Sequence, residues 1–141
     1  MKVIKINRSW TLILLAVLMV LVALWNGLRL VQGAEFWSVL QEYNSHPGPL
    51  YQVISAGIWL VLGLATAWGI WQNKKWSWFT AIAGVIGYAS WYWIDRLVLQ
   101  EPHANWPFAL GATLVFTLFS LSTLFSPKTR QTFLKDTYER K

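Results

Sequence analysis

The chain has 141 residues, of which 55% are hydrophobic, 13% are charged and none is cysteine. Soluble domains carry about a quarter charged residues, so this composition excludes an ordinary soluble fold and predicts an all-α integral membrane protein with one domain. Disulfides, thiolate metal ligands and thiol nucleophiles are excluded as well. The net charge of +6 comes from basic clusters beside apolar segments, which indicates membrane topology and not nucleic-acid binding.

Four apolar segments predict a four-helix transmembrane bundle. Each is long enough, at about 1.5 Å per residue, to cross a hydrocarbon core of about 30 Å. The predicted crossings cover about 10–30, 50–71, 78–99 and 106–125. The first is too long for a secretory signal peptide, so we expect it to remain in the protein. We assign 1–126 to the transmembrane domain and 127–141 to a basic cytoplasmic tail, which could contact anionic lipid through Phe133, Leu134 and Tyr138.

The segment between the first two crossings predicts a short interfacial helix. Phe36, Leu40 and Tyr43 recur at i, i+4 and i+7, with polar residues on the other side. We expect a helix over 34–43 that lies along the membrane surface over the outer end of the bundle, with Phe36, Trp37 and Leu40 facing apolar material.

Small residues and turn residues predict how the later helices meet. Gly63 and Ala67, four positions apart in the second crossing, favour close approach of another helix backbone. Residues 72–75 predict a tight basic turn. Asn105, just before Trp106 and Pro107, is typical of a helix N-cap.

Basic residues predict the orientation of the bundle. Both termini and the turn at 72–75 carry ten of the twelve Lys and Arg residues, whereas the opposite ends hold Arg29 and Arg96. The positive-inside rule therefore predicts cytoplasmic N- and C-termini, most simply in a bacterial inner membrane. Trp residues near both ends, including Trp78 at the inner end and Trp91 at the outer end, fit interfacial belts and leave Trp59 near the middle.

A candidate polar cluster lies at the outer ends of the first and third crossings. Arg29 follows Trp10 by 19 positions and Asp95 follows Trp78 by 17, so two parallel helices would hold them at similar depth. Adjacent residues point about 100° apart, so Asp95 is expected to pair with Arg29, while Arg96 reaches the outer headgroups. Asn26 or Tyr88 should complete the hydrogen bonding.

The candidate binding residues are those of this cluster and of the helical stripe that contains Asp95: Asn26, Arg29, Tyr88, Trp91, Asp95 and Arg96. Two interpretations stay open. The pair could be a structural salt bridge between two helices, or it could form part of a binding site for an anionic or lipid-like molecule.

Other chemistry has little support in the sequence. His46 and His103 fall in outer connections without a metal-ligand spacing, and no catalytic or phosphate-binding motif is present. We therefore expect no metal, no cofactor and no catalysis. The sequence predicts a small accessory or interaction subunit of a membrane assembly, with the bilayer and other membrane proteins as partners. The alternatives are an outward-facing binding or transport protein that uses the polar cluster and, with least support, a lipid-active enzyme with Asp95 or His103 as base.

Overall fold

The computed structural model describes residues 10–43, 47–100 and 104–134, and these are helical without any strand. The helices are α1 (Trp10–Glu35), α2 (Trp37–Glu42), α3 (Pro49–Trp71), α4 (Lys75–Ile94), the π-helix η1 (Asp95–Leu99), α5 (Trp106–Phe125) and α6 (Pro127–Leu134).

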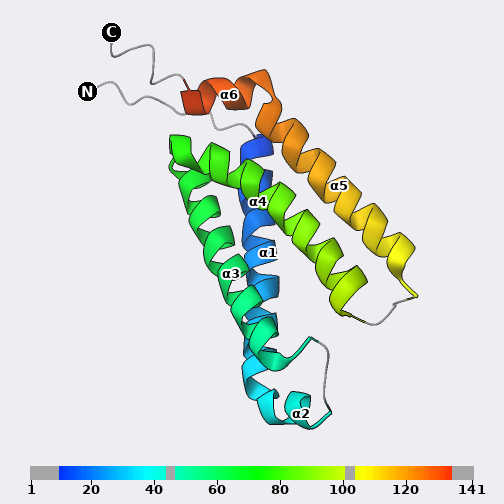
Figure 1. Cartoon of the computed structure of the whole chain (residues 1–141). Coiled ribbons are helices and arrows are strands. Elements are labelled where there is room, and N and C mark those ends of the chain that lie inside the picture. Colours follow the sequence, from blue (N-terminus) through cyan, green and yellow to red (C-terminus); the bar gives the residue numbers. More distant parts are fainter. Residues whose placement is uncertain (1–9, 44–46, 101–103, 135–141) are drawn as a thin grey trace.

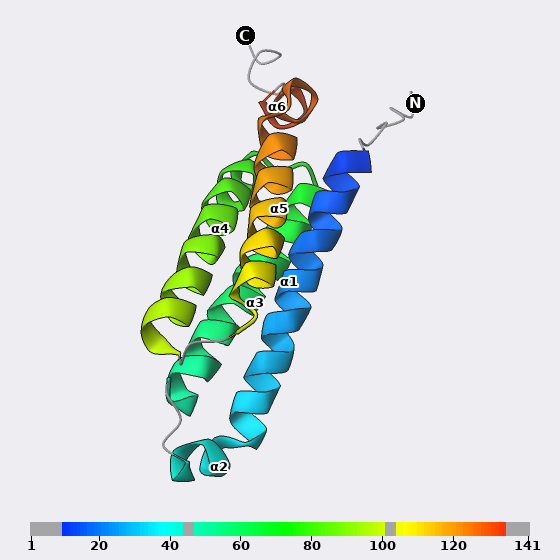
Figure 2. The ribbon, with the colours of Figure 1, turned by 90° about the vertical axis from the view of Figure 1, so that its right-hand side faces the viewer.

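Four long helices lie side by side and alternate in direction (Figures 1 and 2). The start of α1, the α3–α4 turn and α6 share one end of the bundle, and α2 and the last turns of α4 lie toward the other. Three of the helices, α1, α3 and α5, are long and apolar enough to cross a membrane. The structure is thus that of an all-helical membrane protein.

Large apolar side chains cover the outside of this bundle. Leu21, Trp25, Val61, Val115 and Leu118 are each more than half exposed, and many more residues on the four long helices behave likewise. A soluble monomer rarely exposes contiguous apolar surface on this scale. The exposed surface therefore suits a hydrocarbon environment.

The first helix extends past its predicted end. Residues 31–33, expected in a connection, and 34–35, expected to begin the interfacial helix, instead continue α1 to Glu35. Gly33 is buried in this last part, where an added Cβ would lie 3.0 Å from a methyl group of Val53 in α3. Packing against α3 therefore stabilises helix through a residue that by itself weakens helices.

The short helix expected in the following connection is present, with narrower bounds. α2 covers Trp37–Glu42 and packs against α1 and α3. Trp37 and Leu40 are partly buried against the protein, whereas the Phe36 side chain is 54% exposed. Because α1 runs to Glu35, Phe36 lies at the junction between the two helices and not on the α2 packing face.

The α3–α4 turn is built by a left-handed asparagine. Asn73 has φ of 54°, and its N–H donates to the Ile70 carbonyl at 3.1 Å while the Lys74 N–H donates to Gly69 at 2.9 Å. These two bonds form a Schellman motif that ends α3, and asparagine tolerates the left-handed conformation better than most residues. The predicted tight turn is confirmed.

The most extensive helix packing joins α1 and α3. A Cβ added to Gly63 would lie 2.9 Å from the Ala23 Cβ and 3.3 Å from the Met19 carbonyl oxygen. Gly57 similarly faces Leu30. Small residues thus let the two backbones approach, as the sequence predicted for Gly63.

The main apolar core lies at the end of the bundle that holds the start of α1, the α3–α4 turn and α6. Leu15, Ile70, Trp78, Leu124 and Phe133 are buried together there. Trp78 was expected in an interfacial belt, and this is wrong, because its indole N–H donates to the Leu124 carbonyl at 2.9 Å. Phe133, expected to dip into lipid, instead packs on this core through α6; Tyr138 lies outside the described residues.

Trp78→Phe should lower the free energy of unfolding by about 1 kcal/mol, because it removes the hydrogen bond to the carbonyl near the end of α5 while keeping most of the buried ring. The measurement is reversible unfolding in mixed micelles. Trp76→Phe is the matched control, since Trp76 is 41% exposed. Equal effects of the two substitutions would contradict the assigned role of Trp78.

Candidate functional site

Arg29 and Asp95 form an ion pair between α1 and η1. The closest approach is 3.8 Å, between Arg29 Nη2 and Asp95 Oδ2. The Asp95 side chain is 3% exposed and that of Arg29 is 20% exposed. The structure therefore brings together the two residues that depth matching predicted. A carboxylate this deeply buried requires such compensation.

The π-helix supplies a second partner for Asp95. In η1 the Gln100 N–H donates to the Asp95 carbonyl at 3.1 Å, five residues back, and Gln100 Nε2 donates to Asp95 Oδ2 at 2.6 Å. Residues five apart lie on different sides of an α-helix, whereas a π-turn brings them together. The change of helix type at Asp95 is thus what gives its carboxylate an amide donor.

Trp91 contacts Arg29 and connects it to Tyr51. The Arg29 guanidinium carbon lies 5.2 Å from the centre of the Trp91 ring, within the range of a cation–π interaction. The Trp91 indole N–H donates to the Tyr51 hydroxyl of α3 at 2.9 Å. Arg29, Trp91 and Tyr51 thereby connect α1, α4 and α3 at one level.

Asn26 and Tyr88 do not complete the hydrogen bonding of Asp95, so that expectation is wrong. Asn26 Nδ2 donates to the Val22 carbonyl at 2.8 Å and reaches the Tyr88 hydroxyl at 3.5 Å. Tyr88 is two helical turns before Asp95, which places this contact deeper in the bundle. Among the described residues, Asn26 Oδ1 and Asp95 Oδ1 are buried without a hydrogen-bond partner.

Arg96 has partners within the chain, and the headgroup contact expected for it stays a prediction. Its guanidinium donates to the Tyr92 hydroxyl at 3.2 Å and to the side-chain oxygen of Asn105. Asn105 does precede α5, but its side chain makes no capping bond because it accepts from Arg96. Arg96 thus connects the end of α4 to the start of α5.

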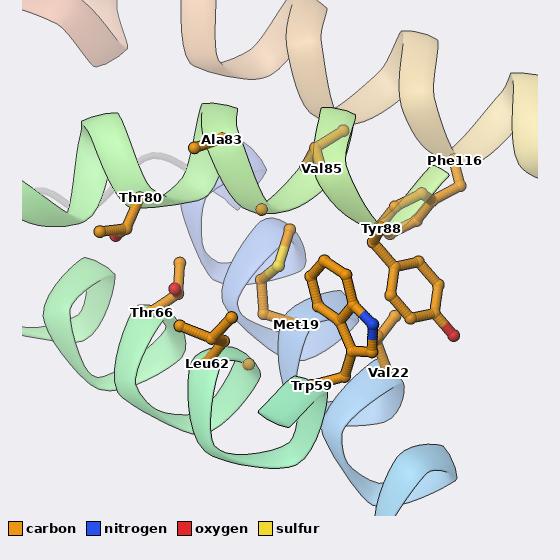
Figure 3. Close-up of a pocket in the computed structure, with 12 residues that line it drawn as sticks. Met19, Val22, Trp59, Leu62, Thr66, Thr80, Ala83, Val85, Tyr88 and Phe116 are labelled. Atoms are coloured by element: carbon orange, nitrogen blue, oxygen red, sulfur yellow. The ribbon is translucent and has the colours of Figure 1, made fainter. Parts of the chain in front are cut away.

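An apolar cavity of about 190 Å³ lies deeper in the bundle, among α1, α3, α4 and α5 (Figure 3). Trp59 and Tyr88 line its end nearest the polar cluster, and neither Arg29 nor Asp95 reaches it. The rings of Trp59, Tyr88 and Trp91 pack against one another, one pair edge-to-face and two pairs tilted, at centroid distances of 5.1 to 5.6 Å. This aromatic layer separates the polar cluster from the cavity.

The arrangement holds charge but offers little reaction chemistry. In the described ranges no group of three or more His, Asp and Glu side chains could bind a metal ion, and both histidines lie outside those ranges. Asp95 Oδ2 already faces Arg29 and Gln100, and the unpartnered Oδ1 is buried, so a substrate would reach the carboxylate only after neighbouring side chains moved. The side chains of this cluster join α1, α3 and α4.

Two members of the cluster were missed from the sequence: Tyr51 and Gln100. Depth matching applied to the second crossing, which runs inward, would have placed Tyr51 near Arg29. Gln100 depends on the π-turn, for which the sequence carries no clear signal. Trp59 was singled out only as the tryptophan that fits neither belt.

The site and fold define a class, an all-helical protein with membrane-length apolar helices and a buried inter-helix ion pair. Comparison with protein-family models, curated proteins and solved structures gives no match to this chain.

Proposed function

We propose that the protein is a four-helix transmembrane bundle with both termini in the cytoplasm, in a bacterial inner membrane. The distribution of basic residues over the fold supports this orientation. Lys74, Lys75, Lys128 and Arg130 gather at the end that holds the α3–α4 turn and α6. At the opposite end Arg29 and Arg96 are held by side chains of the chain itself. The positive-inside rule then places the α6 end in the cytoplasm.

The proposal includes α4 as a crossing, although its composition is less apolar than that of the other three. α4 has 20 residues, about 30 Å of helix, and lies beside α3 and α5. It begins at the end where α3 finishes and leads toward the end where α5 begins. A helix placed in this way passes through the same depth as its neighbours.

We propose that this bundle acts without catalysis, as an accessory or interaction subunit of a larger membrane assembly. One observation carries the proposal: Arg29, Asp95 and Arg96, the three charged residues of the polar cluster, are all engaged by other side chains of the bundle. Buried polar groups in membrane proteins mark functional pathways when they face a cavity. Here the aromatic layer separates the polar cluster from the central cavity. The role that this leaves for the cluster is to hold the helices together.

The surface that would meet another membrane protein is an apolar groove between α1 and α5. It is lined by Leu18, Phe108, Gly111, Ala112, Val115, Phe116 and Phe119. A Cβ on Gly111 would meet nothing within 4 Å, so the α5 backbone is accessible there. Small residues at an exposed helix face are typical of helix–helix contacts in membranes.

Purification in mild detergent followed by native mass spectrometry tests the interaction role. We expect the protein to travel with a membrane protein in fixed stoichiometry, and Gly111→Leu to reduce the recovered partner at least fivefold by filling the groove. Val61→Leu is the matched control on the exposed face of α3. A protein that remains alone with intact fold, or a Gly111→Leu variant with full recovery, would contradict the proposal.

The alternative, an outward-facing binding or transport protein, has one observation in its favour. A cleft of about 440 Å³ opens at the outer part of the bundle, and Tyr92 and Asn105, the two partners of Arg96, line it. An anionic amphiphile could place its chain in this cleft and its head near Arg96. Dodecyl phosphate binding that weakens at least tenfold in Arg96→Gln, but not in Lys128→Gln, would favour this function.

A further inference from the structure

The central cavity is the feature of the fold that the proposed function does not use. It lies about halfway along the helices, beside Met19 of α1, Gly63 of α3 and Gly84 of α4. Its walls are almost wholly apolar, with the hydroxyl-bearing Thr66 and Thr80 at one side (Figure 3). An apolar cavity of this kind stays free of water and takes apolar guests.

Aromatic rings close the cavity toward the polar cluster. Figure 3 shows the Trp59 ring between Met19 and Tyr88, with the Tyr88 hydroxyl directed away from the centre of the cavity. That hydroxyl reaches Asn26, so Tyr88 presents its apolar ring to the cavity and its polar end to the cluster. A polar or charged guest would find no counterpart at this end.

The cavity opens between α3 and α4. Leu62 of α3 is 45% exposed and Ala83 of α4 is also exposed, whereas Met19 and Val85 on the inner walls are buried. In the proposed membrane orientation the opening faces hydrocarbon at mid-depth. The surrounding medium at this opening would be the acyl chains of lipids.

We propose that the cavity binds part of an acyl chain of a membrane phospholipid, which enters sideways between α3 and α4. A cavity of about 150 Å³ already holds a benzene-sized guest, so about 190 Å³ is sufficient for a short run of methylene groups. Leaving such a space empty would forfeit contacts along its whole lining. The Trp59 and Tyr88 rings supply flat apolar contact surface for the chain.

This inference rests on the proposed membrane crossing and not on the accessory role. If the cysteine labelling described in the Discussion shows that the helices do not cross the membrane, the proposed topology and this inference are both wrong. If the crossing holds and no chain enters the cavity, only this inference falls.

The test is photo-crosslinking in vesicles of phosphatidylcholine that carries a diazirine near the middle of one acyl chain. Residue-level mass spectrometry is expected to find adducts on Met19 or Val85, which are 6% and 1% exposed and therefore shielded from lipid outside the bundle. Adducts on Leu24 of α1, which is 55% exposed and lies outside the groove that contains Gly111, provide an internal standard in every sample.

Gly84→Leu should reduce the inner adducts at least tenfold relative to those on Leu24. Gly84 lines the cavity, and a Cβ there meets nothing within 4 Å, so the added side chain can occupy the space without a clash. Gly111→Leu is the matched control, because Gly111 is an equally open helix glycine that lies outside this cavity. It should leave the inner adducts unchanged.

A second variant guards against a folding defect. Ala83→Phe places its ring at the opening, where Ala83 is already exposed, and should lower the inner adducts while circular dichroism stays unchanged. Absence of adducts on Met19 and Val85 in the wild-type protein, or adducts that persist in both Gly84→Leu and Ala83→Phe, would overturn the proposal.

Discussion

Arg29→Met is expected to lower the free energy of unfolding by about 3 kcal/mol, because it strands a buried carboxylate. Asp95 would keep Gln100 as its side-chain hydrogen-bond partner, with its own side chain only 3% exposed. Asp95→Asn should cost less, about 1 kcal/mol, for two reasons. Asparagine can still accept from Gln100, and Arg29 is 20% exposed and remains stacked on Trp91. The measurement is reversible unfolding in mixed micelles of mild detergent and dodecyl sulfate.

The double variant decides whether the pair is structural. Arg29→Met combined with Asp95→Asn removes both charges, so the loss should be about 2 kcal/mol smaller than that of Arg29→Met alone. Arg96→Met serves as the control, with an expected effect below about 1 kcal/mol, because Arg96 bonds to neutral partners near the surface. Strictly additive losses in the double variant would show that Arg29 and Asp95 do not stabilise each other.

Gly63→Ala is expected to lower the free energy of unfolding by about 2 kcal/mol, although alanine favours helix. The new methyl would lie 2.9 Å from the Ala23 Cβ and 3.3 Å from the Met19 carbonyl oxygen, so α1 and α3 must separate slightly. The same substitution at Gly111, where a Cβ meets nothing within 4 Å, should be neutral or stabilising by up to about 1 kcal/mol.

A compensating change identifies the cause. Ala23→Gly in the Gly63→Ala background removes the opposing methyl and should restore about half of the lost stability, the remaining cost coming from the Met19 carbonyl and the glycine in α1. Unfolding of the single and double variants in the same micelles gives the comparison. Failure of Ala23→Gly to recover any stability would place the strain elsewhere.

Periodicity and composition were sufficient to predict the four long helices and the Arg29–Asp95 pair, but not the π-helix η1 or α6 in the basic tail. Long apolar runs and helix-breaking residues locate α3 and α5 closely, and two parallel helices of known start fix the depth of Arg29 and Asp95. The prediction failed where tertiary packing decides local structure. Gly33 looked like part of a loop, yet Val53 of α3 packs against it within α1.

The errors in the candidate site have physical causes of the same kind. A shared helix face does not put side chains at the same depth: Asn26 and Tyr88 lie about one and two turns deeper than Arg29 and Asp95, so they meet each other and not Asp95. Gln100 reaches Asp95 because the chain changes from α- to π-helix, a small energetic preference that hydrophobic patterns do not report. The position of Trp78 near the start of a crossing is typical of an interfacial tryptophan. In the fold its indole N–H donates to the Leu124 carbonyl near the end of α5, so the side chain is buried.

Cysteine labelling in intact spheroplasts tests the membrane-crossing bundle most directly, since the chain has no cysteine of its own. Ser38→Cys on α2, Gln72→Cys in the α3–α4 turn and Lys128→Cys on α6 all place the thiol at exposed positions. Four crossings predict that an impermeant maleimide labels Ser38→Cys from outside, and that it labels Gln72→Cys and Lys128→Cys only after the membrane is opened. If α1, α3 and α5 crossed without α4, Lys128 would lie outside, so labelling of Lys128→Cys in intact spheroplasts would contradict the account.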